Sequence, residues 1–393
     1  MLGDGDMQNF VYDIPTIVYF GEGQISQIGK LAAETGKKAL IVYGGGSIKK
    51  NGLFYTVTHY LDEAGIAYKE LGGVEPNPKI TSVRKGVEIC KKEQIDMLIP
   101  IGGGSVIDCA KGIAVGAKYD GDAWDLVVDT SKIKDALTII TVLTIAATGT
   151  EMDFYAVISN METNDKISID NRCLFPKYSI LDPKYTETVS AYQTASGTAD
   201  IMSHVFEVYF RKCGDTYIQD QFMEGILRTC IKYGKIAVEQ PNNYDARANL
   251  MWASSWAING MIACGKSGAW VCHPIEHQLS AYYDITHGMG LAVITPYWMR
   301  KILDDTIVDV FVNYGVNVWH INEKLDKYEI ANLAIDKTAE FFVSMGIPTT
   351  LRELGITEKS KFEIMAEKAA KGLDKAYNPL SKEDVMEILE AAF

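Results

Sequence analysis

The stretch IPIGGGSVIDCAKG, residues 99–112, decides the fold class of this 393-residue chain. A β-branched apolar run ends at three consecutive glycines, and a helical pattern starting at Ser105 follows directly. Glycines let the backbone turn tightly at such a junction, and its free N–H groups and helix dipole favour a phosphate group. The stretch predicts a strand–turn–helix unit, in which the turn is either a simple connection or part of a nucleotide site.

The rest of the first half repeats this alternation of β-branched runs and helical patterns. We expect strands at residues 38–43, 68–71, 96–101 and 136–143, and helices over 51–65, 80–92 and from 105 onward. Strands that alternate with helices form crossover units on a parallel sheet. A ligand of such a sheet lies beyond the carboxyl ends of the strands.

The pattern changes near residue 190, after which the sequence is helical almost throughout. The last helix is typical: Ser381 can cap it, Asp384 completes a capping box, and an apolar stripe follows. We therefore predict an α/β domain over residues 1–190 and an all-helical domain over residues 191–393.

The composition indicates a protein that works on small molecules in the cytoplasm. A net charge of −13 argues against binding to nucleic acid or to an anionic membrane, since both require a basic face. The run over residues 136–147 is too short to span a bilayer, and the acidic N-terminal stretch lacks the features of a signal peptide. Seven scattered cysteines without a C-x-x-C pair fit a reducing compartment.

A second glycine turn, Gly44–Ser47, follows the strand expected at residues 38–43. Neither turn matches the G-x-G-x-x-G fingerprint or the P-loop, but two such turns on one sheet favour nucleotide binding. NAD-selective sites carry an acid near the end of an early strand, and none is near in sequence here. Ser47, Lys49 and Lys50 could instead bond to a 2′-phosphate, which mildly favours NADPH over NADH.

Five side chains in the helical half are candidates for a metal site. Asp200 and His204 stand four residues apart, as do His273 and His277, so each pair shares one helix face. His287 follows where another helix can start. Carboxylate and imidazole together suit iron, zinc or manganese. The spacing predicts a divalent metal but leaves open which of the five residues bind it.

One alternative is a zinc peptidase. HPIEH, residues 273–277, formally matches the H-x-x-E-H pattern in which Glu276 would be the general base. Pro274 favours the first turn of a helix over its interior, and this function would leave the glycine turns and the Asp200–His204 pair unused.

Four stretches together resemble the iron-containing (group III) alcohol dehydrogenase family, in particular its butanol dehydrogenase branch. These are IGGGSVIDCAKG, TIAATGTEMD, TASGTADIMSH and HPIEHQLSAYYDITHGMGLA, and the likeness runs essentially end to end. The resemblance implies Asp200, His204, His273 and His287 as ligands of iron, with zinc as the alternative ion. It implies that His277 is a non-ligating catalytic histidine near the nicotinamide and the substrate.

The resemblance also implies a nicotinamide cofactor, a homodimer and a set of cofactor contacts. The expected cofactor-binding residues are Gly44, Gly45, Ser47, Asn77, Gly102, Gly103, Gly104, Ser105, Asp108, Thr144, Thr148 and Lys166. The branch shares the first glycine turn where NAD-preferring relatives carry an aspartate.

The chemistry agrees with this resemblance. Reduction of a short aldehyde such as butanal needs hydride from the nicotinamide, a Lewis acid on the carbonyl oxygen and a proton donor, which we assign to His277. Dehydroquinate synthase and glycerol-1-phosphate dehydrogenase share the architecture, but their phosphate-bearing substrates need basic residues that are scarce around the ligand motifs. A nucleotide-binding protein with a structural metal is the non-catalytic alternative.

Overall fold

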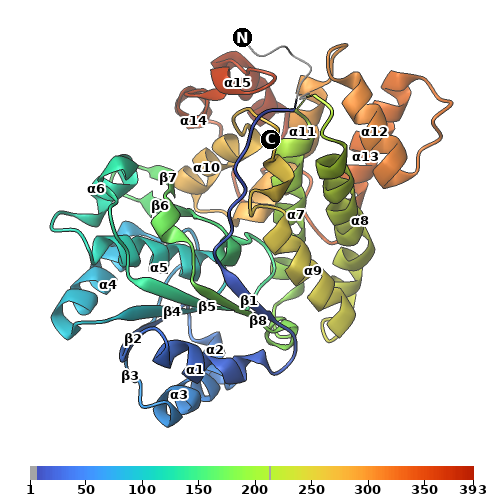
Figure 1. The fold of residues 1–393 in the computed structure, drawn as a ribbon. Helices are drawn as coiled ribbons and strands as arrows, with labels where there is room; N and C mark the ends of the chain where they lie inside the picture. Colours follow the sequence, from blue (N-terminus) through green and yellow to red (C-terminus); the bar gives the residue numbers. More distant parts are fainter. Residues whose placement is uncertain (1–6, 212–213) are drawn as a thin grey trace. The chain divides into compact units, whose positions relative to one another are not determined.

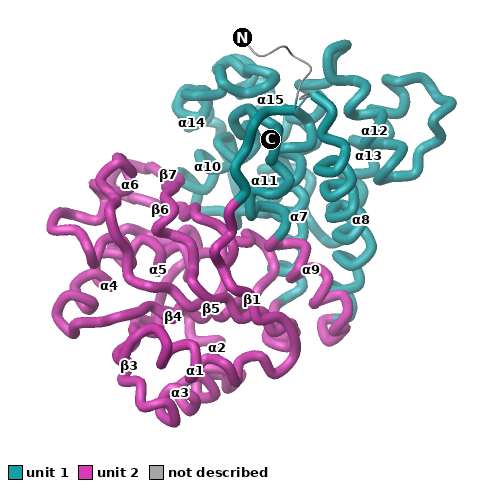
Figure 2. Tube along the Cα trace, in the orientation of Figure 1, with its two compact units in different colours: residues 1–12, 190–240, 256–393 teal, residues 13–189, 241–255 magenta. Residues whose placement is uncertain are grey.

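The computed structural model describes residues 7–211 and 214–393, which form two compact units (Figure 2). Residues 1–6 of the N-terminal stretch and Cys213 lie outside the described residues. The α/β unit contains Asp13–Val189 and Pro241–Ser255, and the helical unit contains the described residues 7–12, 190–211, 214–240 and 256–393. The boundary near residue 190 between the two predicted domains stays a prediction.

Six parallel strands form the sheet of the α/β unit, in the order β1-β8-β5-β4-β2-β3. The strands are β1 (Ile17–Phe20), β2 (Lys38–Tyr43), β3 (Ala67–Leu71), β4 (Met97–Gly102), β5 (Thr138–Leu143) and β8 (Tyr178–Leu181). The central strands β2, β4 and β5 are almost wholly buried, as apolar strands covered on both faces must be. The predicted parallel α/β sheet is confirmed.

Helices cover both faces of this sheet (Figure 1). One face carries α1 (Ile28–Ala33), α2 (Ser47–Lys50) and α3 (Leu53–Glu63), and the other carries α4 (Ile80–Glu93), α5 (Gly104–Gly116) and α6 (Ala123–Val128). Because side chains alternate along a strand, Leu40 of β2 joins the core beneath α4 and α5 while Ile41 joins the core beneath α1 and α3.

Several parts of the α/β unit were not predicted from the sequence, among them the strands β1 and β8 of the sheet. An antiparallel hairpin of β6 (Tyr155–Asn160) and β7 (Asp165–Asp170) buries its apolar residues in the α4–α5 core. Helix α9 (Tyr244–Trp256) belongs to this unit except for its last residue, although it lies in the second half of the chain. Its Met251 packs against Ile107, Leu143 and Leu181.

The helical unit is built from eight further helices of the described chain. They are α7 (Ala191–Tyr209), α8 (Tyr217–Glu239), α10 (Cys272–Tyr283), α11 (His287–Ile302), α12 (Val308–Trp319), α13 (Lys327–Ser344), α14 (Phe362–Ala369) and α15 (Lys382–Ala391). The predicted capping box of the last helix is confirmed, with Ser381 and Asp384 bonded reciprocally. Among the described residues no helix has the length and apolar character needed to cross a membrane, and the six described cysteines are free thiols.

Candidate active site

Helix α7 carries the first two candidate metal ligands into the interior of the helical unit. Ser190 caps the helix, and every residue from Thr194 to Tyr209 is buried. Asp200 and His204 therefore lie one turn apart on a helix that is enclosed on all sides. His204 Nε2 is 3.6 Å from Asp200 Oδ1, which is too long for a hydrogen bond.

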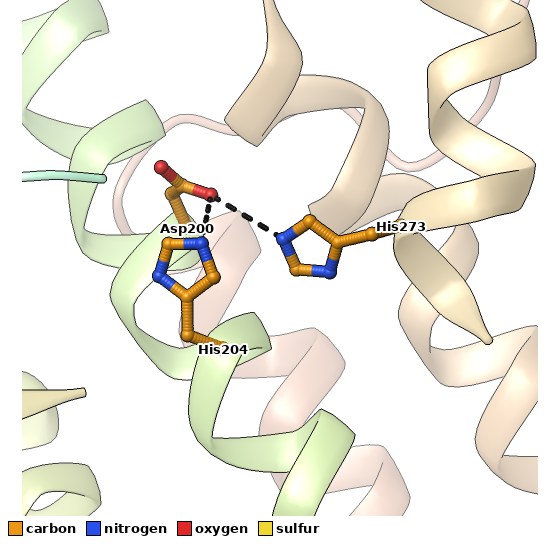
Figure 3. Close-up of side chains that lie close together, drawn as sticks. All are labelled: Asp200, His204 and His273. Atoms are coloured by element: carbon orange, nitrogen blue, oxygen red, sulfur yellow. Dashed lines mark ion pairs between the residues drawn. The ribbon is translucent and has the colours of Figure 1, made fainter. Parts of the chain in front are cut away.

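Helices α10 and α11 bring two more imidazoles to the same carboxylate oxygen. His273 Nε2 lies 3.9 Å and His287 Nε2 lies 3.7 Å from Asp200 Oδ1. Figure 3 shows Asp200, His204 and His273 pointing toward one another. Gly288 makes this approach possible, because a Cβ there would overlap the Ser196 carbonyl oxygen of α7. Three Nε2 atoms thus converge on one oxygen from three helices.

The buried polar atoms at this point fit a metal ion. Asp200 Oδ1 and His273 Nε2 have no hydrogen-bond partner among the described residues, a costly state for buried polar atoms. Two ligands that each lie about 2.1 Å from one ion are about 3.4 Å apart in tetrahedral geometry, close to the spacing seen here. Burial lowers the pKa of His204 to about 4, so its imidazole is neutral and able to ligate.

Two buried glutamates orient the imidazoles of His273 and His287. Glu207 Oε1 lies 3.0 Å from His273 Nδ1, and the Glu207 carboxylate also accepts the backbone N–H groups of Val271 and His273. Burial acts to raise the pKa of Glu207, but these hydrogen bonds outweigh it and hold the pKa below its usual range. Glu276 is hydrogen-bonded to His287 Nδ1. Both histidines therefore direct Nε2 at Asp200, as in carboxylate–histidine–metal arrangements.

Glu207 was not predicted from the sequence, and Glu276 has a different role from the one that the peptidase pattern implies. Glu207 lies three residues after His204, a helical spacing that was a usable signal. Glu276 is completely buried and hydrogen-bonded to His287 and Ser280, so it does not face a catalytic water as a peptidase base would. The geometry gives the zinc-peptidase alternative no support, while Pro274 lies in the first turn of α10 as predicted.

His277 lies on α10 one turn beyond His273 and is half-buried. Its ring centroid is 6.2 Å from that of His273 and 5.5 Å from that of His287. The possible ligand atoms of Asp200, His204 and His273 lie within 4.8 Å of one another. Those of a second group, Glu276, His277 and His287, do so as well. The group around Asp200 is the better metal site, because its carboxylate oxygen is unpartnered whereas the Glu276 carboxylate already holds two hydrogen bonds.

The glycine turn after β4 is shaped by close packing. Gly102 ends β4, and Gly103 is the N-cap residue of α5, with its carbonyl accepting the N–H groups of Val106 and Ile107. Ser105 follows in the first turn of α5. A Cβ on Gly103 would overlap Ile145, and one on Gly104 would overlap Thr148. These glycines therefore let the segment after β5 lie directly against the turn.

Thr144 lies beside the same turn, because its N–H donates to the Gly102 carbonyl at 3.0 Å. The side chains of Thr144 and Thr148 are half-buried. The structure thus brings together the turn and the two threonines that the resemblance assigned to the cofactor.

The carboxylate of Asp108 is hydrogen-bonded to residues outside the glycine turn that follows β4. Its carboxylate accepts the Thr150 hydroxyl at 2.7 Å and the Val157 N–H at 3.0 Å. Burial raises the pKa of Asp108 to about 6. Lys111, fully buried one turn later, donates to Asp153 Oδ1 at 2.7 Å and to Thr150 at 2.9 Å. The cluster fastens the segment after β5 to α5, so a direct cofactor contact of Asp108 stays a prediction.

The predicted cofactor contacts Asn77 and Lys166 are distant in sequence but lie on adjoining segments of the α/β unit. Ser159 of β6 is paired with Lys166 of β7, and its N–H donates to the Pro78 carbonyl at 2.9 Å. Both predicted contacts are buried, and Asn77 has a left-handed φ of 50°. The hairpin that was not predicted therefore places Lys166 near the loop of Asn77.

An acidic side chain, Glu70, lies beside the first glycine turn, although it is distant from the turn in the sequence. Gly46 has a φ of 90° and a Cβ on Gly45 would meet open space, while Ser47 is exposed. Glu70 of β3 accepts the Tyr43 hydroxyl at 2.9 Å and lies 2.6 Å from Lys49 Nζ. Since parallel strands β2 and β3 are neighbours, the carboxylate absent from the end of β2 comes from the next strand.

The chain is similar to known proteins along both of its halves. The family model for iron-containing alcohol dehydrogenase matches residues 15–183, and the model for the C-terminal part of the Fe-containing alcohol dehydrogenase family matches residues 194–393. The NADH-dependent butanol dehydrogenase A of Clostridium acetobutylicum is 55% identical over 98% of this chain and 100% of its own length.

Two further relatives carry different cofactor names. The NADPH-dependent aldehyde reductase of Escherichia coli is 38% identical over 90% of this chain and 91% of its own length. The crystal structure of an NADH-dependent butanol dehydrogenase A from Thermotoga maritima superposes with a TM-score of 0.94 at 38% identity, covering 99% of each chain. The resemblance noted in the sequence is confirmed along both halves of the chain.

Proposed function

This chain belongs to the iron-containing alcohol dehydrogenase family, and we propose that it interconverts short-chain aldehydes such as butanal and their alcohols. The observation that carries this proposal is the convergence of three histidine Nε2 atoms on Asp200 Oδ1. Family membership gives no support to a peptidase, to the phosphate-substrate enzymes of related architecture or to a non-catalytic protein.

Asp200, His204, His273 and His287 hold one divalent ion, with Fe²⁺ as the family's metal and Zn²⁺ as the alternative. When bound, the ion polarises the carbonyl oxygen of the aldehyde as a Lewis acid. Glu207 and Glu276 keep the rings of His273 and His287 turned toward it through their Nδ1 atoms. The unpartnered Asp200 Oδ1 and His273 Nε2 support this ligand set.

His277 supplies the proton that the reaction requires. Hydride transfer to the carbonyl carbon leaves negative charge on oxygen, and an imidazole held close by can deliver a proton to it. His277 stands beside His273 and His287, and its ring nitrogens group with Glu276 and His287, whereas the group around Asp200 contains His204 and His273. This position supports a proton carrier that is not itself a ligand.

The nicotinamide cofactor binds the α/β unit at the carboxyl ends of its strands. Its pyrophosphate lies at Gly102–Ser105, next to Thr144 and Thr148, with Lys166 as a further contact, while Asn77 and the Gly44–Ser47 turn bind its adenosine side. In the sequence analysis above, NADPH was mildly favoured because a 2′-phosphate could bond to Ser47, Lys49 and Lys50. The engagement of Lys49 by Glu70, together with the name of the relative at 55% identity, moves the proposal to NADH.

The test begins with protein purified without air, its metal content measured, and butanal reduction followed by loss of reduced-nicotinamide absorbance. We expect one divalent ion per chain, a faster rate with NADH than with NADPH, and loss of activity with a chelator. Oxidation of neither cofactor by butanal or another short aldehyde would overturn the proposed function.

His277→Ala separates the two roles that an imidazole can have here. We expect kcat to fall by about 100-fold or more with metal content unchanged, because a positioned proton donor contributes roughly that much. Loss of the metal from this variant would make His277 a ligand, and normal turnover would remove it from the mechanism.

We also propose a cytoplasmic homodimer. Strand β1 is an edge strand of the sheet, and Ile17 and Phe20 on it are exposed. An exposed apolar edge is a ready surface for pairing with a second copy. Light scattering during size-exclusion chromatography measures the mass directly, and Ile17→Lys should shift it toward the monomer.

A further inference from the structure

A second feature of the first glycine turn concerns the choice between NADH and NADPH. We propose that the Glu70 carboxylate, held in place by Tyr43 and Lys49, selects a cofactor with a free 2′-hydroxyl over one with a 2′-phosphate. The proposal rests on the proposed function, in that the adenosine side of the cofactor lies at the Gly44–Ser47 turn. It adds a selectivity residue that motif spacing does not reveal.

Glu70 is fixed by two donors. The Tyr43 hydroxyl donates to its Oε2 at 2.9 Å, and Lys49 Nζ donates to the same atom at 2.6 Å. Strand register places Glu70 opposite Ile41, two residues before the end of β2, so it shares a sheet face with Tyr43. The carboxylate is thereby held at the carboxyl end of the β2–β3 pair.

The turn itself is held against the end of β3. The Gly73 N–H donates to the Gly44 carbonyl at 3.0 Å, and the Val74 N–H donates to the Tyr43 carbonyl at 3.2 Å. Open space surrounds the positions where Gly45 and Gly46 would carry a Cβ, and Ser47 is exposed. A ribose can approach the backbone here, with Glu70 on the neighbouring strand.

Lys49 is one of the two cations, with Lys50, that the sequence offers to a 2′-phosphate, and it is already engaged. Its Nζ lies 4.4 Å from the Phe54 ring centroid and 5.0 Å from that of Tyr43, in addition to the bond to Glu70. These contacts direct the ammonium group to the carboxylate. A ribose 2′-hydroxyl can donate to such a carboxylate, whereas a 2′-phosphate meets like charge and a cation that is already paired.

Binding of two small probes tests the selectivity role of Glu70. The measurement needs neither catalytic activity nor bound metal, and the probes carry no nicotinamide. Calorimetry of the full chain compares ADP, which has a free 2′-hydroxyl, with 2′,5′-ADP, which has a 2′-phosphate. We expect the wild-type protein to prefer ADP. Glu70→Gln should strengthen 2′,5′-ADP binding by roughly tenfold relative to ADP, because Lys49 then has a phosphate as its only anionic partner.

Two further variants make the result specific. In Glu70→Gln combined with Lys49→Met, the gain in 2′,5′-ADP binding should disappear. Glu93→Gln is the matched control: Glu93 forms a similarly exposed pair with Lys38, 3.0 Å apart, at the opposite end of β2, and its loss should leave the ratio of the two affinities unchanged.

An unchanged ratio in Glu70→Gln, or an equal change in Glu93→Gln, would overturn the selectivity role. Failure of the wild-type protein to bind ADP, 2′,5′-ADP or NADH at all would instead contradict the proposed function. The two failures are therefore distinguishable.

Discussion

The two units each bury a cluster of charged side chains, and the clusters differ in whether their polar atoms are satisfied. In the α/β unit, Lys111 Nζ donates to Asp153 and Thr150, and Thr150 donates to Asp108. In the helical unit, Asp200 Oδ1 and His273 Nε2 have no hydrogen-bond partner among the described residues. A buried cluster whose polar atoms are hydrogen-bonded to one another stabilises the fold. A buried cluster whose polar atoms point at one another without hydrogen bonds is suited to bind an ion.

The largest expected effect is on the unsatisfied cluster. Asp200→Asn keeps the side-chain shape but removes the negative charge on which three imidazoles converge. We expect the bound metal to be lost and kcat/KM for butanal to fall by about 1,000-fold or more, equivalent to about 4 kcal/mol. Metal analysis and steady-state kinetics measure the two effects. Retention of metal and activity would show that the ion does not depend on this cluster.

Breaking the satisfied cluster should affect stability instead of metal binding. Lys111→Met leaves Asp153 and Asp108 buried without their cation, which should cost about 3–5 kcal/mol. Urea unfolding measures the loss, and metal content per folded chain should not change. Lys118→Met is the control, because Lys118 pairs with Asp135 at the surface and should cost less than about 1 kcal/mol. Equal losses in the two variants would refute the comparison.

Glu151 represents a third outcome for a buried carboxyl group, namely protonation. Burial raises its pKa to about 7, a hydrogen bond from Ser255 opposes the shift, and Oε2 has no partner among the described residues. The folded state therefore holds a proton that the unfolded state releases above its pKa of 4.5. Folding stability should fall as pH rises from 4.5 to 7, by about 3 kcal/mol.

Glu151→Gln removes this pH dependence. Relative to the wild-type protein, the variant should gain about 3 kcal/mol of stability between pH 4.5 and pH 8. Urea unfolding at the two pH values gives the difference. Parallel pH profiles of the two proteins would show that the Glu151 carboxyl group does not titrate between the folded and unfolded states as expected.

The smallest expected effect comes from a residue that only orients a ligand. Glu207→Gln weakens the partner of His273 Nδ1 and should lower metal affinity by about 10–100-fold. Glu224→Gln is the matched control, because Glu224 is also buried in the helical unit but bonds to Tyr209 and Asn317. Metal competition titrations should separate the two variants. If both change metal affinity alike, Glu207 acts through general stability.

Much of the architecture could be predicted because it follows from local patterns. The strand at residues 38–43 is β2, the helix expected over 80–92 is α4 to within one residue, and α11 begins at His287. The β6–β7 hairpin was not predicted, since short apolar runs beside a continuing chain carry little information about their pairing.

The candidate site was predictable in part for the same reason. Helical periodicity alone put Asp200 with His204 and His273 with His277 on shared faces. It did not divide the histidines into ligands and a proton carrier, and it gave no signal for Glu70, which lies 27 residues from Tyr43. Side chains that meet through strand neighbours or helix crossings leave no fixed spacing in the sequence.

Strand and helix periods and turn chemistry are local properties, so the fold class, the two glycine turns and the set of candidate metal ligands follow from the sequence alone. The folded protein adds how the side chains meet: three Nε2 atoms face Asp200, Glu207 and Glu276 orient two of the rings, and Glu70 engages Lys49 beside the first turn. Those contacts depend on how elements that are distant in the sequence pack against one another. The packing of the whole core, and no single local pattern, determines them.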